Sequence, residues 1–284
     1  GDHRDLHLSI RRQRQMCIRD SEYSELALNI VTVVGMSTAF FAASVALVQT
    51  DIKKIIAYST CSQLGYMFFA AGVGAYNVAM FHLFTHAFFK ALLFLGAGSV
   101  IHSFQNEQDI KNMGGVWRKL PFTYLMMIIG TLALTGFPFL SGFYSKDAII
   151  EFAYLEKGSL SNYAAAIGII TAIFTSIYSW RLIFLTFHGS FNNNKLNIKD
   201  LHESPLVMLI PLILLSVGAL FSGMFFKEIF IGAESSQLFW KDSIMFLEPL
   251  SIDQPPLWFL LLTPSFVILS IPFSYYLFLK KKLI

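Results

Sequence analysis

The sequence predicts an all-α polytopic membrane protein with about seven transmembrane helices, one of them discontinuous. Hydrophobic residues make up 55% of the chain and charged residues only 14%, whereas soluble domains carry roughly 25% charged residues. Apolar runs follow one another along the chain, and one of them is too long for a single crossing. The formal net charge is only +3, which argues against a nucleic-acid partner.

Residues 22–284 are expected to form one transmembrane domain. Most of the apolar runs are near the length of about 20 residues that crosses a hydrocarbon core of about 30 Å. The predicted spans are 26–48, 55–73, 77–101, 122–155, 163–187, 205–227 and 257–279. Residues 1–21 are arginine-rich and contain no apolar run. We therefore expect a disordered or non-native leader there, outside the fold.

The loops between these spans differ in positive charge. One side carries Lys53, Lys54, Lys111, Arg118, Lys119, Lys195, Lys199 and Lys280 to Lys282, and the other carries only Lys157, Lys227 and Lys241. The positive-inside rule places the first side, with the C-terminus, in the cytoplasm or matrix. An odd number of spans agrees with this alternation.

The apolar run 122–155 predicts a discontinuous helix. A straight helix of this length would extend for about 51 Å, well beyond the bilayer. Gly136, Pro138 and Gly142 interrupt its middle, because proline removes a backbone donor and glycine weakens a helix. Such a break is tolerated at membrane depth only where protein or a water-filled cavity satisfies the backbone. Lys146 and Asp147 follow the break, an arrangement typical of ion-transport sites.

Three ionisable residues share one face of the predicted span 77–101. His82, His86 and Lys90 are spaced i, i+4 and i+8, so they point in nearly the same direction, about 6 Å apart along the axis. Ionisable groups inside a span indicate a functional site. We interpret this polar row as a proton relay, since neutral histidine accepts a proton on one nitrogen and donates from the other. Water molecules would have to bridge the gaps.

Two alternatives to the relay stay open. The polar row could hold helices together through hydrogen bonds. His82 and His86 could instead bind a metal or haem, although the glutamate of the zinc-protease pattern is missing and His102 and His188 lie near span ends. The two cysteines, Cys17 and Cys61, form no motif. Without a phosphate loop or a redox-centre signature, the chain is expected to carry no cofactor of its own.

Lys146 and Arg181 are the other charged groups expected within spans. Burial disfavours the charged form of a lysine, which is what Lys146 would need in order to load and release protons. Asp147 opposes this effect if it pairs with Lys146, and a static ion pair that closes the broken helix is the alternative. An arginine stays charged, so Arg181 is expected to have a structural or field-setting role.

Several long motifs resemble the antiporter-like membrane subunits of respiratory complex I, and most closely the largest of them. They are DIKKIIAYST at 51–60 with SQLGY at 62–66, HLFTHAFFKALLF at 82–94, and GFYSKD at 142–147. The resemblance covers about residues 25–279. It implies an antiporter-like fold, of which the chain would contain the second five-helix repeat and two further helices. Because the first repeat and a long lateral helix are missing, the chain is expected to be a C-terminal fragment.

The resemblance also implies residue roles. Lys53 or Lys54, with Lys53 the better fit, would match a buried lysine at the start of one helix. The polar row of His82, His86 and Lys90 would match its counterpart on the next helix. Lys146, with Asp147 beside it, would match the lysine of the broken helix.

The function implied is that of a non-redox, proton-translocating subunit of NADH:quinone oxidoreductase, driven by remote quinone reduction. Its partners would be the lipid bilayer and other membrane subunits, especially a neighbouring antiporter-like one. Other subunits of the complex would carry FMN, iron–sulfur clusters and quinone. The membrane would be the bacterial inner membrane, or alternatively the mitochondrial inner membrane. The rival functions are a subunit of a multisubunit cation/proton antiporter and a purely structural membrane spacer.

Overall fold

The structure is a computed structural model that describes residues 24–156, 158–193, 196–198, 200–232, 235–241, 243–244 and 255–281. The leader predicted at 1–21 lies outside these residues.

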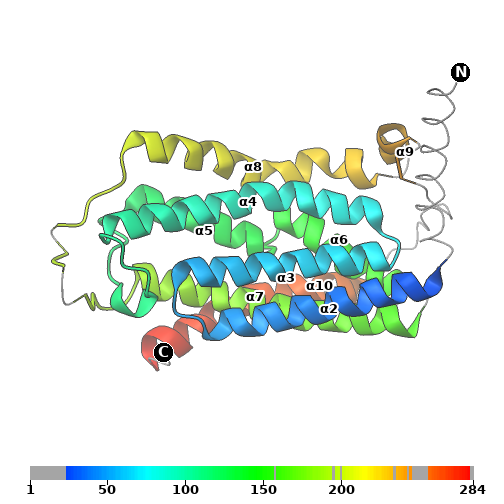
Figure 1. The fold of residues 1–284 in the computed structure, drawn as a ribbon, viewed down its shortest axis with the longest axis horizontal. Helices are drawn as coiled ribbons and strands as arrows, with labels where there is room; N and C mark the ends of the chain where they lie inside the picture. Colours follow the sequence, from blue (N-terminus) through cyan, green and yellow to red (C-terminus); the bar gives the residue numbers. More distant parts are fainter. Residues whose placement is uncertain are drawn as a thin grey trace, which may run out of the picture.

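Six long helices of the described chain run along one common axis (Figure 1): α2 (Glu25–Val48), α3 (Ile52–Gly72), α4 (Tyr76–Ser103), α7 (Ser159–Phe187), α8 (Leu206–Ile231) and α10 (Leu257–Tyr275). Two half-length helices, α5 (Pro121–Thr135) and α6 (Ser141–Leu155), lie end to end. The short segments are η1 (Ile110–Asn112), α9 (Ser235–Trp240) and η2 (Tyr276–Lys280).

Among the described residues, five helices are long and apolar enough to cross a membrane, by length and composition alone: Glu25–Val48, Tyr76–Ser103, Leu160–Phe187, Leu206–Ile231 and Leu257–Lys280. Helix α3 is 21 residues long, which also reaches across a bilayer, but polar side chains lower its hydropathy. The half-helices α5 and α6 have 15 residues each and cross only as a pair. The prediction of an all-α polytopic membrane protein is therefore confirmed.

Helix α3 packs closely against α2 because small residues let the two backbones meet. A Cβ atom on Gly65 would lie 2.5 Å from the backbone nitrogen of Ala39. Small residues serve this purpose in membrane helices, where apolar side chains gain little by leaving lipid. This contact leaves the other face of α3 free to pack polar residues against α4, α6 and α7.

The two ends of the bundle differ in charge. We call the inner end the one formed by the loops after α2, α4 and α7, where exposed side chains include Lys53, Lys54, Lys111, Arg118 and Lys119. The opposite, outer end includes the exposed Lys227 and Lys241. Lys157, Lys195, Lys199 and Lys282 lie outside the described residues.

Candidate functional site

The break between α5 and α6 is built by the glycines and the proline that interrupt the apolar run. Helix α5 ends at Thr135 because Gly136 adopts a left-handed conformation with φ of 81°, which glycine reaches at no steric penalty. Pro138 lies in the turn that follows, and α6 begins at Ser141. Gly142 lies one residue further, inside α6 rather than in the break.

Gly142 allows the two half-helices to approach each other. A Cβ atom at this position would lie 1.8 Å from the carbonyl oxygen of Ala133, a distance at which the backbone of α5 or α6 would have to move. The break therefore depends on two glycines for different reasons: Gly136 for its φ angle and Gly142 for space.

Lys146 is fully buried beside the break. Its Nζ donates a hydrogen bond of 3.1 Å to the carbonyl oxygen of Thr135, and it lies 6.0 Å from the centroid of the Tyr66 ring. The last carbonyls of a helix have no partner within the helix, and they carry partial negative charge that favours a cation. Ending α5 at mid-bundle therefore creates the acceptor that holds Lys146.

Asp147 is also buried, with 6% of its surface exposed. Among the described residues, neither of its carboxylate oxygens has a hydrogen-bond partner. Since Lys146 donates to the carbonyl of Thr135, the two neighbours are not joined by a hydrogen-bonded ion pair. This geometry does not match the alternative of a static pair that closes the broken helix.

His82 connects α4 to both α3 and α6. Its Nδ1 lies 2.9 Å from Ser145 Oγ, and its Nε2 lies 3.0 Å from Gln63 Oε1. Thr85 Oγ1 lies 2.7 Å from the same Ser145 oxygen. Ser145 directly precedes Lys146 in the chain, so this hydroxyl network brings the polar row of α4 to the broken helix.

His86 occupies the middle of the row. Its ring centroid lies 6.0 Å from that of His82, and Phe89 contacts it edge to face at 5.3 Å. In the described part of the chain, its Nε2 is buried without a hydrogen-bond partner. A proton could cross this gap only through an intervening water molecule.

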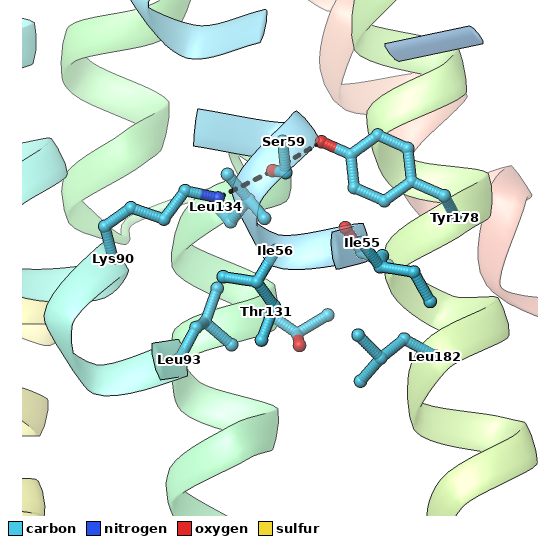
Figure 2. A pocket seen from close by; sticks show the side chains of 10 residues that line it. Ile55, Ile56, Ser59, Lys90, Leu93, Thr131, Leu134, Tyr178 and Leu182 are labelled. Carbon is cyan, nitrogen blue, oxygen red and sulfur yellow. Dashed lines mark hydrogen bonds between the residues drawn. The ribbon is translucent and has the colours of Figure 1, made fainter. Parts of the chain in front are cut away.

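Lys90 begins a second hydrogen-bonded group, which Figure 2 shows from close by. Its Nζ donates to Ser59 Oγ at 2.7 Å, and the hydroxyl of Tyr178 donates to the same oxygen at 2.6 Å. Helices α3, α4 and α7 therefore meet at one serine. A small cavity adjoins this group, lined by Ile55, Ile56, Ser59, Lys90, Leu93, Thr131, Leu134, Tyr178, Ser179 and Leu182.

Sequence reasoning did not single out Ser59, Gln63, Ser145 or Tyr178. Each is a polar residue within an apolar run, and each is fully or almost fully buried. That placement was the available signal, because a buried polar group needs a partner. The identity of the partner depends on how three helices pack, which no local pattern contains.

Lys53 and Lys54 lie apart from the buried row. Their backbone N–H groups donate to Asp51 Oδ1 at 2.8 and 3.1 Å, which caps the first turn of α3. Both side chains are exposed. Neither lysine is therefore folded into the bundle. This differs from the buried lysine that was expected at the start of α3.

Arg181 is buried near the inner end of α7. Its Nη1 donates to the carbonyl oxygen of Gln49, just after the end of α2. This contact fixes two helix ends to each other and agrees with a structural role. Within the described residues, no group of three or more His, Cys, Asp or Glu side chains is placed to hold a metal ion.

Together these contacts place His82, His86, Lys90 and Lys146 inside the bundle, shielded from bulk solvent. His82 and Ser145 belong to one hydrogen-bonded group, Lys90 and Ser59 belong to another, and His86 lies between the two groups along α4. Lys146 directly follows Ser145 and donates to the carbonyl of Thr135. Such a series can exchange protons where water completes the gaps.

The chain is similar to known proteins over the helices that carry these residues. The family model described as "NADH:quinone oxidoreductase/Mrp antiporter, TM" matches residues 13–175. NADH-ubiquinone oxidoreductase chain 5 of Marchantia polymorpha is 52% identical over 226 residues, which cover 80% of this chain and 34% of that protein. NADH-quinone oxidoreductase subunit L of Rhodobacter capsulatus is 54% identical over 229 residues, covering 77% and 32%. The chain therefore spans about a third of the length of these relatives.

Two solved structures share the fold. The Mrp complex from Dietzia sp. DQ12-45-1b contains a chain that matches with a TM-score of 0.71 and 24% identity, over 90% of this chain and 28% of that one. A chain of the membrane-bound sulfane sulfur reductase, an archaeal respiratory membrane complex, matches with a TM-score of 0.64 and 27% identity, over 70% and 32%.

Proposed function

The chain belongs to the NADH:quinone oxidoreductase/Mrp antiporter transmembrane family, and we propose that it is part of a proton-translocating membrane subunit of NADH:quinone oxidoreductase. The relatives that are about half identical are named as chain 5 or subunit L of that oxidoreductase. In this proposal the chain moves protons and carries no redox centre, while quinone reduction elsewhere in the complex drives the movement.

The observation that carries the proposal is the burial of four protonatable side chains in one series across the bundle. Lys90, His86 and His82 follow each other along α4, and Ser145 connects His82 to the segment of Lys146. Ionisable groups are expensive inside a membrane and are found there mainly on ion pathways. A water-filled path through this series would let protons pass between the inner and outer ends.

Each member of the series would have a distinct role. Lys90 and Lys146 would load and release protons, because burial makes the charged ammonium less favourable. The histidines would relay protons between them. Asp147 would modulate Lys146 by moving towards or away from it. Lys53 and Lys54 would join the path at its inner end where a neighbouring subunit covers α3.

The expected partners are the lipid bilayer and other membrane subunits of the complex, above all a neighbouring antiporter-like subunit. Other subunits of the complex would carry FMN, iron–sulfur clusters and quinone. The membrane would be the bacterial inner membrane or the mitochondrial inner membrane, since relatives of both kinds match.

The test replaces Lys90 or Lys146 by alanine in the assembled complex and measures protons moved per NADH oxidised in sealed vesicles. We expect each substitution to remove most of this proton movement, because alanine cannot hold a proton at that position of the series. Lys111→Ala is the matched control, because Lys111 is an exposed lysine of the inner end. Normal proton movement in the Lys90 and Lys146 variants would refute the assignment and favour the structural spacer.

A second candidate is a subunit of a multisubunit cation/proton antiporter, favoured by the fold shared with the Mrp complex. Co-purification with flavin and iron–sulfur subunits supports the oxidoreductase. Sodium-dependent transport without NADH oxidation supports the antiporter.

A further inference from the structure

The ammonium group of Lys90 has more donors than the surrounding protein satisfies. A lysine ammonium carries three N–H donors, and the described residues offer it one acceptor, Ser59 Oγ. Ser59 also accepts from the hydroxyl of Tyr178, so both lone pairs of its oxygen are in use. Because only 4% of Lys90 is exposed, its remaining donors need a partner inside the bundle.

The cavity beside Lys90 contains a polar group in the complementary situation. Ser179, on α7, lines the cavity and is 4% exposed. Its Oγ is buried and has no hydrogen-bond partner among the described residues. The cavity has room for about one water molecule. A water needs two to four polar partners in such a place, and Lys90 on α4 and Ser179 on α7 supply two of them.

The cavity lies on the inner side of Lys90. Ile55 precedes Ser59 by one turn of α3, and Leu182 follows Tyr178 by one turn of α7. Both positions are closer to the inner end of the bundle than the serine that holds Lys90. A water in the cavity would therefore be the last group that a proton arriving from the inner end passes before it reaches Lys90.

We infer that this cavity is a binding site for one ordered water molecule that connects Lys90 to the hydroxyl of Ser179. Ser179 is then a positioning residue, which holds the water against the amine. When Lys90 is neutral, a proton that reaches this water passes to the amine nitrogen, and the water returns to its neutral form. The inference rests on the proposed function and adds the side from which Lys90 receives its proton.

The experiment compares Ser179→Val, which removes the hydroxyl and fills the cavity, with Ser179→Ala and Ser179→Thr in the assembled complex. We expect Ser179→Val to reduce protons moved per NADH oxidised on the order of tenfold and Ser179→Ala by a smaller factor. Ser179→Thr, which keeps a hydroxyl, should retain most of the activity. Ser274→Val is the matched control, because Ser274 is a buried serine of α10 that lies outside the cavity and whose Oγ has no hydrogen-bond partner within the described part of the chain.

A density map of the assembled complex at a resolution that shows ordered water gives the independent readout. We expect a water between Lys90 and Ser179 in the wild type and none in Ser179→Val, and an empty cavity in the wild type would overturn the inference. If Ser179→Val does not assemble, Ser179→Ala and the wild-type map decide in the same way. Normal proton movement in Ser179→Val and Ser179→Ala, while Lys90→Ala is inactive, would refute only the water site. Normal movement in Lys90→Ala as well would refute the proposed function.

Discussion

Lys90 and Lys146 are both buried lysines of the same bundle, but the protein holds them by different means. Lys90 lies on the continuous helix α4 and donates to a side-chain hydroxyl, Ser59 Oγ, beside a cavity. Lys146 lies on a half-helix and donates to a main-chain carbonyl, that of Thr135. One lysine depends on the identity of a neighbouring side chain, and the other depends on where a helix ends.

This difference suggests different sensitivities to movement. The carbonyl of Thr135 is free to accept only because α5 stops there, so any change in the break alters the environment of Lys146. The Ser59 hydroxyl shifts only when α3, α4 or α7 shift against one another. A conformational change that reaches the break would therefore switch Lys146 while leaving Lys90 in place.

The largest effect is expected for Gly142→Ala. The added methyl would overlap the carbonyl oxygen of Ala133, and neither backbone can yield without dismantling the break. We expect a loss of stability of about 3 kcal/mol and little assembled complex on a native gel. Gly98→Ala is the control, because a Cβ atom there meets nothing within 4 Å in the described chain. Normal assembly of Gly142→Ala would show that the two half-helices do not need this approach.

The next effect separates the two lysines directly. Ser59→Ala removes the acceptor of both Lys90 and Tyr178 and should cost about 1–3 kcal/mol, together with much of the proton movement. Thr135→Val removes only a local hydroxyl contact to the carbonyl of Leu132 and keeps the carbonyl that binds Lys146. We expect it to cost about 1 kcal/mol or less, because it removes one local hydroxyl hydrogen bond. Thermal denaturation of the complex and vesicle assays measure both. Equal effects of the two substitutions would contradict the distinction.

Substitutions of the two histidines should affect stability differently but transport alike. His82→Leu breaks hydrogen bonds to Gln63 and Ser145, so it should lower stability by roughly 1–3 kcal/mol. His86→Leu removes a ring nitrogen that has no partner in the described residues and should leave stability nearly unchanged. Both should slow proton movement if the row is a relay. A His86→Leu variant with normal transport would indicate that protons bypass this position.

The smallest effect concerns His188, which follows α7 at the inner end. Partial burial lowers the pKa of His188 below its usual value, and its Nε2 lies 2.9 Å from the hydroxyl of Tyr124. The unfolded chain then binds a proton more readily than the folded one. The contribution of neutral His188 is thus complete above about pH 6.5 and is lost as the pH falls below that value.

Because His188 is only partly buried, solvent screening should keep this contribution below about 0.5 kcal/mol. His188→Gln should flatten the pH dependence of the denaturation temperature between about pH 7.5 and about pH 5.5, each about one unit from the usual histidine pKa of about 6.5. A slope that is unchanged in this variant would mean that other groups cause it. This background has to be known before pH profiles of transport are assigned to Lys90 or Lys146.

The helices themselves follow from local features of the chain. Apolar runs of the right length predict the spans, and Gly136 with Pro138 predicts that one span is interrupted. The i, i+4, i+8 spacing predicts that His82, His86 and Lys90 share a face of α4, as α4 places them. Lys53 and Lys54 differ from expectation, because the start of a helix can lie at the surface or inside, and sequence does not distinguish the two.

The sequence by itself determined which residues are ionisable, which runs suit a membrane, and where a helix cannot continue, since these depend on side-chain chemistry and backbone geometry within a few residues. Only the tertiary structure decided that Ser59 binds Lys90, that Thr135 binds Lys146, and that Ser145 connects His82 to the broken helix. Those contacts join residues on different helices, 11 to 63 positions apart in the chain. They arise from the close packing of four helices, which sets the partner of every buried donor.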